Sequence, residues 1–208
     1  MSKQELNNII TIDEARILIW ELTENMDDLL LQLPELDVAE LQKHSSEKRK
    51  LEFLGVRIAL KALLGKEIIV KYDANGKPFL ADNSYHISVS HSVKWIAVMA
   101  HPTQLVGIDI EVPTDKIQRI YKRFLSTIEQ EELSNGNDIS QLHLAWSAKE
   151  ALYKIIGKEA IDFAKQLRIF PFDVKPAGEI SALHIESETH YQLHYIQNQS
   201  YTLVYCLA

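Results

Sequence analysis

Cysteine is almost absent from this 208-residue sequence, in which Cys206 is the only one. No intramolecular disulfide and no cysteine-based metal cluster can therefore form, which fits a reducing compartment. Glycine and proline are also few, 7 and 6 residues, beside a hydrophobic content of 46%. This composition excludes collagen-like, disordered and coiled-coil proteins and predicts an ordinary globular fold.

Long apolar runs and a surplus of positive charge are missing as well. No apolar run approaches the ~20 residues of a membrane helix, and the start, M-S-K-Q-E-L-N-N, lacks the pattern of a signal peptide. The formal net charge is −7, whereas a general nucleic-acid binder would normally show a basic surface. We therefore expect a soluble cytoplasmic protein without nucleic-acid or membrane partners, although a local basic pocket remains compatible with this charge.

Apolar periodicity predicts helices that alternate with short strands, which is typical of an α+β fold. The clearest helix is expected over 46–64, begun by a serine and ended by Gly65. Other helical patterns cover 24–33, 114–133 and 139–156. Strands are expected at 15–22, 68–72, 86–90, 95–100, 105–111, 167–170, 179–186, 191–197 and 201–207. Each half thus places helix before a small, mostly antiparallel sheet, and we expect two similar subdomains, 1–105 and 106–208.

The stretch G-I-D-I-E places two carboxylates on a predicted strand. Because strand side chains alternate between faces, Ile108 and Ile110 should point into the core while Asp109 and Glu111 share the other face. Two carboxylates this close repel each other unless a cation or water screens them. Taken alone, the spacing also suits an ordinary solvated sheet face.

Three other stretches combine polar groups in a similar way. In W-S-A-K-E-A-L-Y-K, Trp146, Glu150 and Lys154 follow one another at helical spacing. A surface ion pair between the last two would contribute only about 0.3–0.5 kcal/mol. The stretches S-V-S-H-S (88–92) and G-K-P-F-L (76–80) suit a polar hairpin tip and a tight turn.

The order of these four stretches along the chain is more specific than any one of them. G-K-P, S-H-S, G-I-D-I-E and W-S-x-K-E-x-x-x-K together resemble the 4′-phosphopantetheinyl transferase superfamily, and the length and layout resemble its larger, pseudo-dimeric branch (the surfactin-synthetase-activating type). One departure is Ser88, where the family often has asparagine.

The resemblance implies two subdomains related by pseudo-two-fold symmetry, with coenzyme A and the active site at their junction. The implied reaction transfers 4′-phosphopantetheine from coenzyme A to a serine of an acyl, peptidyl or aryl carrier protein and releases adenosine 3′,5′-bisphosphate. A monomer is expected, because both halves lie in one chain.

The resemblance also assigns residues to roles. Asp109, Glu111 and Glu150 would hold Mg²⁺, which prefers carboxylate, water and phosphate oxygens; Asp109 also counts among the coenzyme A contacts. The remaining coenzyme A contacts are expected from Arg49, Arg57, Lys77, Pro78, Ser90, His91, Lys149 and Lys154. Within this set, Ser90 and His91 would read the 3′-phosphate, and Lys149 and Lys154 would donate to phosphate oxygens. Lys48 and Glu129 match the family more loosely.

Two questions stay open from the sequence. The base that removes the proton of the carrier serine is either Glu150, acting through a water, or Lys154. The same carboxylates would also suit a Mg²⁺-dependent phosphoesterase or nuclease, and a non-catalytic carrier-binding module is a further alternative. The sequence does not distinguish which carrier protein and pathway are served.

Overall fold

The structure is a computed structural model that describes residues 9–34, 36, 38–133, 136–157 and 161–208. The first half contains β1 (Ile9–Ile12), β2 (Ala15–Glu21), α1 (Met26–Leu30), α2 (Val38–Gln42), α3 (Glu47–Leu64), β3 (Val70–Tyr72), β4 (Pro78–Leu80), β5 (His86–Ser92) and β6 (Trp95–His101). The second contains β7 (Val106–Glu111), α4 (Ile117–Phe124), α5 (Thr127–Glu132), α6 (Ile139–Ile156), α7 (Phe163–Gln166), β8 (Leu167–Ile169), β9 (Ala177–His184), β10 (Thr189–Gln197) and β11 (Thr202–Leu207).

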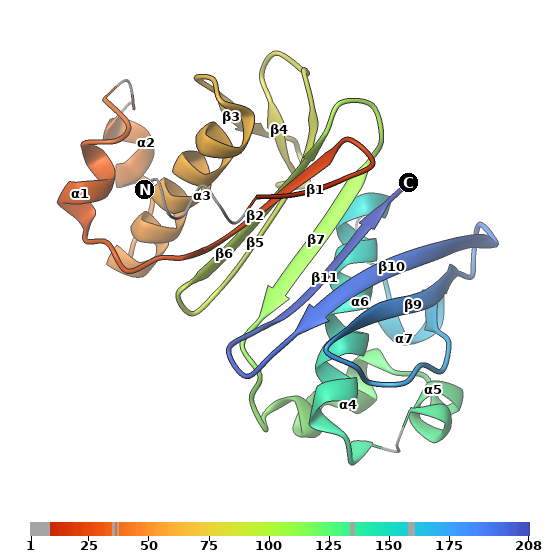
Figure 1. The fold of residues 1–208 in the computed structure, drawn as a ribbon. Coiled ribbons are helices and arrows are strands. Elements are labelled where there is room, and N and C mark those ends of the chain that lie inside the picture. Colours follow the sequence, from red (N-terminus) through yellow and green to blue (C-terminus); the bar gives the residue numbers. More distant parts are fainter. Residues whose placement is uncertain (1–8, 35, 37, 134–135, 158–160) are drawn as a thin grey trace.

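The strands form two antiparallel sheets and a separate β3–β4 ribbon. The first sheet has the order β1-β2-β6-β5 and the second the order β7-β11-β10-β9-β8 (Figure 1). The two sheets share a motif. In each half, one strand precedes the long helix, and the last strand of the half pairs with that strand. On its other side, this last strand pairs with the strand that comes immediately before it in the chain. This motif is β2-β6-β5 with α3 in the first half and β7-β11-β10 with α6 in the second. The predicted α+β class with two similar halves is therefore confirmed.

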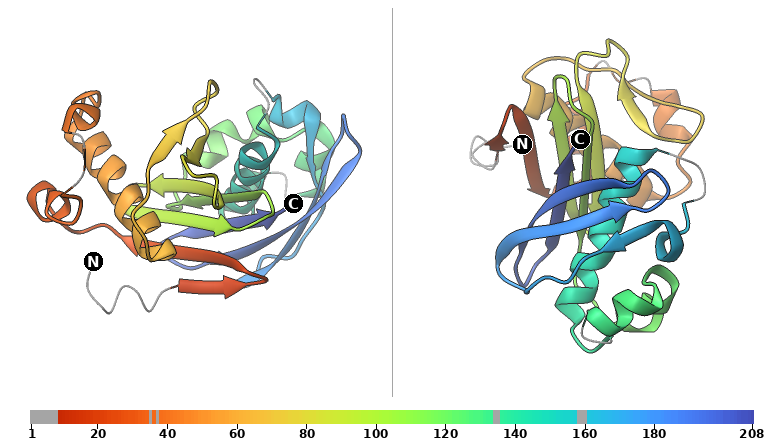
Figure 2. Two further views of the ribbon diagram at one scale, coloured as in Figure 1. Left: turned by 90° about the horizontal axis from the view of Figure 1, so that it is seen from above. Right: turned by 90° about the vertical axis from the view of Figure 1, so that its right-hand side faces the viewer.

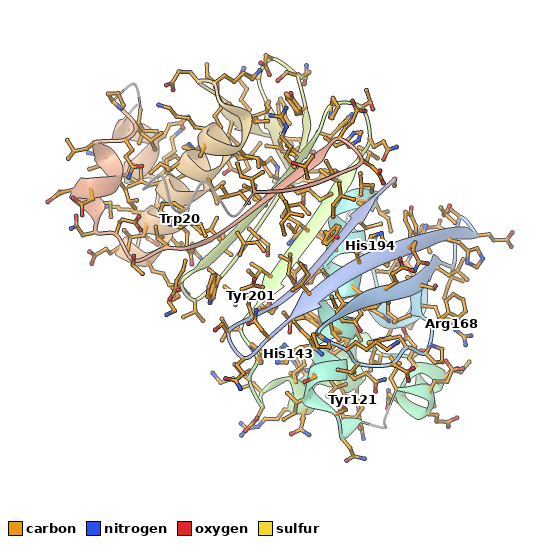
Figure 3. All side chains as sticks on the ribbon, viewed as in Figure 1. Trp20, Tyr121, His143, Arg168, His194 and Tyr201 are labelled. Atoms are coloured by element: carbon orange, nitrogen blue, oxygen red, sulfur yellow. The ribbon has the colours of Figure 1, made fainter. Side chains whose placement is uncertain are left out.

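Side chains alternate between the two faces of each strand, so each sheet packs on a helix with one face and on the other sheet with the opposite face. The result is four layers in the order helix, sheet, sheet and helix (Figure 2). On β2, Leu18 and Trp20 pack toward α3, and Figure 3 shows Trp20 on that side of the sheet. The alternate residue Ile17 faces the second sheet, where it shares an apolar cluster with Ile108 and Ile110. The other side of the second sheet packs on α6. Both halves thus depend on one central apolar interface.

The two long helices begin and end in the same way. Ser46 accepts a hydrogen bond from the Arg49 amide at 3.2 Å before α3, and Asp138 caps α6 through the amide of Gln141. Gly65 and Gly157 end the helices in the left-handed conformation, at φ 67° and 65°. The helix predicted over 46–64 is confirmed.

Elsewhere the element boundaries differ from the prediction. The single helical pattern over 114–133 is two helices, because Leu125 and Ser126 are extended and Ser126 starts α5 with a capping box to Glu129. The sheets change between β6 and β7, where the boundary between 1–105 and 106–208 was placed, although whether the halves fold as separate units stays a prediction. Within the described residues, no helix combines the length and the apolar character needed to cross a bilayer.

Candidate active site

The carboxylates of β7 face α6 rather than solvent. Ile108 and Ile110 are fully buried between the sheets, while Asp109, on the other face, is only 4% exposed. The expected alternation is confirmed, but the reading of an ordinary solvated face is wrong for Asp109. A carboxylate this deeply buried needs partners that compensate for its lost hydration.

A glycine lets α6 approach this strand closely. A Cβ atom on Gly107 would lie 2.1 Å from the backbone oxygen of Ala151, so only glycine fits here. One turn after Glu150, the ammonium group of Lys154 donates to the Ile108 carbonyl at 2.7 Å and to Asp109 Oδ1 at 2.9 Å. The close packing of strand and helix therefore places the Lys154 charge directly on Asp109.

Asp109 has one satisfied oxygen and one without a partner. Oδ1 accepts from Lys154 and also from the Ser90 hydroxyl at 2.8 Å. Oδ2 is buried without a hydrogen-bond partner among the described residues. Buried polar atoms are normally paired, so an orphaned carboxylate oxygen indicates a place for a cation or a donor.

Burial and the charge of Asp109 raise the pKa values of both Glu111 and Glu150. Burial, followed by the charge of Asp109, raises the pKa of Glu111, whose Oε2 accepts from Ser92 at 2.8 Å and whose carboxylate also bonds to the Trp146 side chain. Burial, followed by the Asp109 charge, raises the pKa of Glu150 to about 7, although Lys154 opposes this. Three carboxylates with one lysine leave a surplus of negative charge.

This surplus fits a divalent cation. The described residues contain no ready-made group of three His, Cys, Asp or Glu side chains around one point. Mg²⁺ does not need such a group, because it is usually held by one or two carboxylates together with waters and phosphate oxygens of a substrate. The orphaned Oδ2 of Asp109 and the raised pKa values of Glu111 and Glu150 suit that kind of site.

A cavity of about 500 Å³ lies between the halves and is linked to Asp109 through Lys154. The first half lines it with Arg49, Phe53, Lys77 and His91, and the second half with Tyr153 and Lys154. Lys154 therefore contacts both the cavity and Asp109. A concave site with an aromatic wall and several cations suits a ligand that combines a flat ring with phosphate groups.

Several predicted coenzyme A contacts lie at this cavity. Lys77 and Pro78 line it, and the Lys77 ammonium lies 3.4 Å from the Ile155 carbonyl. Burial lowers the pKa of Lys77. His91 is 3.4 Å from Glu52, and its side chain is half exposed. The Ser90 hydroxyl, expected at a 3′-phosphate, instead donates to Asp109.

The structure does not bring Arg57 to the cavity. Its guanidinium lies 3.4 Å from the centroid of the Phe53 ring and pairs with Glu40 at 3.5 Å. Only 6% of the Arg57 surface is exposed, and its contact is with the Phe53 ring rather than with the cavity. The expected direct phosphate contact is therefore corrected to a packing role. Lys48, from the same helix, is exposed and pairs with Glu52 at 3.6 Å.

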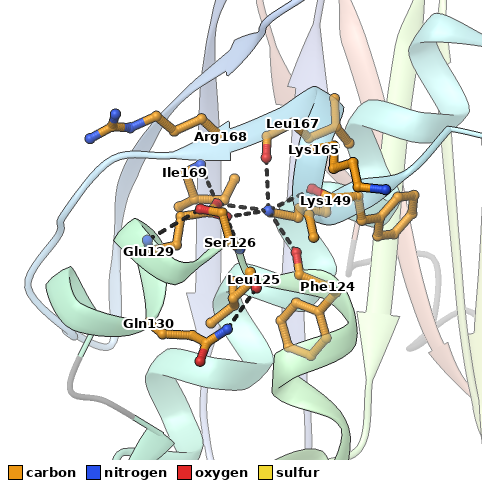
Figure 4. Close-up of polar contacts among 12 residues, drawn as sticks. Phe124, Leu125, Ser126, Glu129, Gln130, Lys149, Lys165, Leu167, Arg168 and Ile169 are labelled. Carbon is orange, nitrogen blue, oxygen red and sulfur yellow. Dashed lines mark hydrogen bonds and ion pairs between the residues drawn. The ribbon is translucent and has the colours of Figure 1, made fainter.

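Lys149 is also corrected. Its side chain is fully buried, and its ammonium binds Glu129 and the carbonyls of Phe124, Phe163 and Leu167, all within 2.8 Å (Figure 4). Burial lowers its pKa to about 8, against the charge of Glu129. All of its donors are used inside the second half, so Lys149 cannot donate to a phosphate in the cavity.

The sequence interpretation missed some residues that build the site. Gly107 determines how closely α6 approaches, and Ser92 holds Glu111. Asn75 and Gly157 line the cavity, and the Asn75 amide lies 3.4 Å from the Gly157 carbonyl across the junction. The turn D-A-N-G and the glycine after the second long helix were visible signals of loops, but nothing local indicated that they meet.

Comparisons with known proteins match parts of this chain. The profile of the 4′-phosphopantetheinyl transferase superfamily matches residues 105–206. A phosphopantetheinyl transferase of Thraustochytrium sp. (strain ATCC 26185 / S-3) is 31% identical over 126 residues, which cover 51% of this chain and 43% of that protein. The 4′-phosphopantetheinyl transferase Sfp of Bacillus subtilis (strain 168) is 34% identical over 87 residues, covering 40% of this chain and 38% of that protein.

The chain thus aligns with less than half the length of either relative. The matched stretch nevertheless contains β7 with Asp109 and Glu111, and α6 with Glu150 and Lys154. The second half of the chain, residues 105–206, thus matches the 4′-phosphopantetheinyl transferase superfamily.

Proposed function

We propose that this protein is a holo-carrier-protein synthase, which transfers 4′-phosphopantetheine from coenzyme A to a serine of a carrier protein in a Mg²⁺-dependent reaction. The observation that carries the proposal is Lys154, which lines the cavity between the halves and also contacts Asp109. The names of both relatives support the same transfer.

Coenzyme A would occupy the cavity between the halves. Its phosphates match the cations Arg49, Lys77 and Lys154, and its adenine ring matches the aromatic wall at Phe53. Because the whole chain has a net charge of −7, these local cations are needed to keep a polyanion from being repelled. His91 stays our candidate for the 3′-phosphate.

Asp109, Glu111 and Glu150 would hold the metal together with pyrophosphate oxygens. When bound, Mg²⁺ would offset the negative charge that develops on the pyrophosphate as the bond to phosphorus breaks. The protein side chains contribute the rest: Asp109 is fixed by Ser90 and Lys154, and Glu111 by Ser92.

Lys154 and Glu150 divide the remaining tasks. Lys154 donates to two oxygens at 2.7 and 2.9 Å, so we assign it as a positively charged clamp for phosphate. Glu150, one helical turn before Lys154, is our candidate for the group that accepts the serine proton through a water. The serine oxygen then forms its bond to phosphorus, the pyrophosphate bond breaks, and adenosine 3′,5′-bisphosphate leaves.

Helix α4 suggests how the protein partner is recognised. Four exposed cations lie on or beside it and have no ion pair with any described residue: Lys116, Arg119, Lys122 and Arg123. The helix begins only a few residues after Glu111, at the end of β7. A basic surface on an acidic protein suits an acidic partner, and we propose that the carrier protein docks here.

One assay distinguishes the candidates. The protein is incubated with coenzyme A, Mg²⁺ and an apo carrier protein, and the carrier is weighed by mass spectrometry. We expect the carrier to gain one phosphopantetheine. Release of phosphate without this gain would indicate a phosphoesterase, and binding without any reaction would indicate a carrier-binding module; Asp109→Asn is the inactive control.

A further inference from the structure

Strands β5 and β7 run side by side although they belong to different sheets (Figures 1 and 2). No backbone ladder joins them in the sheet topology. Serines instead occupy the last three alternate positions of β5, on the side that meets β7: Ser88, Ser90 and Ser92. We call these three residues the serine ladder.

The ladder fixes the register between the two halves. Ser88 Oγ accepts from the Ile108 amide at 3.1 Å, and Ser92 Oγ accepts from the Val112 amide at 3.2 Å, both 20 residues further along the chain. The constant offset means that the strands run parallel. A slip by one residue would break each of these bonds, because side chains alternate between faces.

Two rungs of the ladder end on carboxylates. Ser90 Oγ donates to Asp109 Oδ1 and Ser92 Oγ donates to Glu111 Oε2, each at 2.8 Å. Ser92 therefore uses its hydroxyl twice, as a donor to the Glu111 side chain and as an acceptor from the next backbone amide. It fixes the carboxylate and the strand end that bears it at the same time.

A hydroxyl has a property here that a lysine lacks. It orients the carboxylate without neutralising its charge, so that Glu111 stays available to a cation. Glu111 is only partly buried, and a glutamate side chain loses much rotamer freedom when it is held in one position. A group that restricts Glu111 before the ligands arrive would reduce this cost.

We infer that Ser92 is a positioning residue for Glu111, through which the first half of the chain sets the carboxylate geometry of the second half. The catalytic meaning of this inference rests on the proposed transfer reaction; the effect on metal binding does not. Ser92 is not among the residues that line the cavity, and its role is exerted through Glu111.

The test compares Ser92→Ala with Ser92→Thr, which keeps a hydroxyl on a strand. Two quantities are measured: the Mg²⁺ concentration that gives half of the ligand-induced rise in melting temperature with coenzyme A present, and kcat and KM for the transfer. We expect Ser92→Ala to raise the half-saturating Mg²⁺ concentration and lower kcat by about 10-fold each, as for other residues that orient metal ligands. KM for coenzyme A should change less than about 2-fold, and Ser92→Thr should recover most of the loss.

Two controls separate positioning from stability. Ser88→Ala removes an equivalent rung without a carboxylate, so a purely structural ladder predicts the same Mg²⁺ response as in Ser92→Ala. Ser181→Ala removes a hydroxyl that donates to Gln192 on another strand pair and should behave as wild type. The same Mg²⁺ response and kcat in Ser92→Ala as in wild type would overturn the inference. If wild type transfers nothing but Ser92→Ala still weakens the Mg²⁺ response, the transfer proposal fails while the positioning role stands.

Discussion

Lys149 and Lys154 are both lysines of α6, but they have different roles. They are five positions apart, so at about 100° per residue they point to different sides of the helix. Lys149 lies inside the second half on Glu129, whereas Lys154 lies at the junction on Asp109. Lys149 thus stabilises the fold of the second half, whereas Lys154 forms part of the candidate site.

Substitution of Lys154 tests its role as a clamp. If the ammonium acts through its charge, Lys154→Arg should retain part of the transfer rate, because arginine stays positive. Lys154→Ala should lower kcat by at least about 100-fold, since it removes the phosphate clamp and leaves Asp109 Oδ1 without its ion pair. Steady-state kinetics with coenzyme A and a carrier protein measure both. An arginine variant as inactive as the alanine variant, with coenzyme A binding unchanged, would instead indicate that Lys154 is the base.

Substitution of Lys149 should act on stability. Lys149→Met leaves the Glu129 charge buried without its partner, which typically costs about 3–5 kcal/mol of the free energy of unfolding. Urea denaturation followed by circular dichroism measures the loss, and Lys149→Met combined with Glu129→Leu should recover part of it. Lys165→Ala, which breaks the exposed pair with Asp162, should change the free energy of unfolding far less. A Lys149→Met protein as stable as wild type would argue against a structural pair.

At the scale of elements, the sequence predicted features that depend on residues close together in the chain, such as the beginning and the end of a helix. The helix over 46–64 has a serine cap and a terminal glycine, and both act as expected. The same kind of signal, S-T-I-E at 126–129, starts α5, but the surrounding apolar periodicity hid the break before it. The direction of Lys149 and the serine ladder depend on contacts with residues 14 to 25 positions away, and no local pattern contains that information.

Gly107 is the element-scale residue whose change has the clearest expected effect. A methyl group there would meet the Ala151 carbonyl at 2.1 Å, so Gly107→Ala must push α6 away from β7. Overpacking of this kind costs about 1–3 kcal/mol, and it should also lower kcat because Lys154 and Glu150 move with the helix. Thermal unfolding and steady-state kinetics check the two effects. A Gly107→Ala enzyme with wild-type stability and rate would show that the helix can shift without disturbing the site.

At the scale of the whole molecule, the apolar interface between the sheets and the polar junction are parts of one arrangement. Ile108 and Ile110 join the halves on one face of β7, while Asp109 and Glu111 meet α6 and the serine ladder on the other. The carboxylates are therefore held close together by the fold itself. Their mutual repulsion must lower the stability of the whole chain whenever they are all ionised without a cation.

This coupling predicts an unusual dependence of stability on pH. The pKa of Glu150 rises from 4.5 to about 7 on folding, and that of Glu111 is also raised. The native state therefore binds more protons than the unfolded state between these values, so the stabilising contribution is complete below about pH 4.5 and is lost as pH rises through 7. For Glu150 alone the loss is on the order of 3 kcal/mol. His143, whose pKa burial lowers, acts in the opposite direction at acidic pH, so the comparison must be made with a variant.

Glu150→Gln supplies that comparison, because it removes the titrating proton and keeps the shape of the side chain. Without metal, the melting temperature of wild type should fall relative to Glu150→Gln as pH rises from about 5 to 8. Added Mg²⁺ should reverse the difference at pH 8, since a cation bound only by the native carboxylates stabilises the folded state. Calorimetry at several pH values, with and without Mg²⁺, gives both results. Parallel curves for the two proteins across this range would mean that Glu150 does not share the charge of Asp109, and the assignment of Glu150 to the metal site would fail with it.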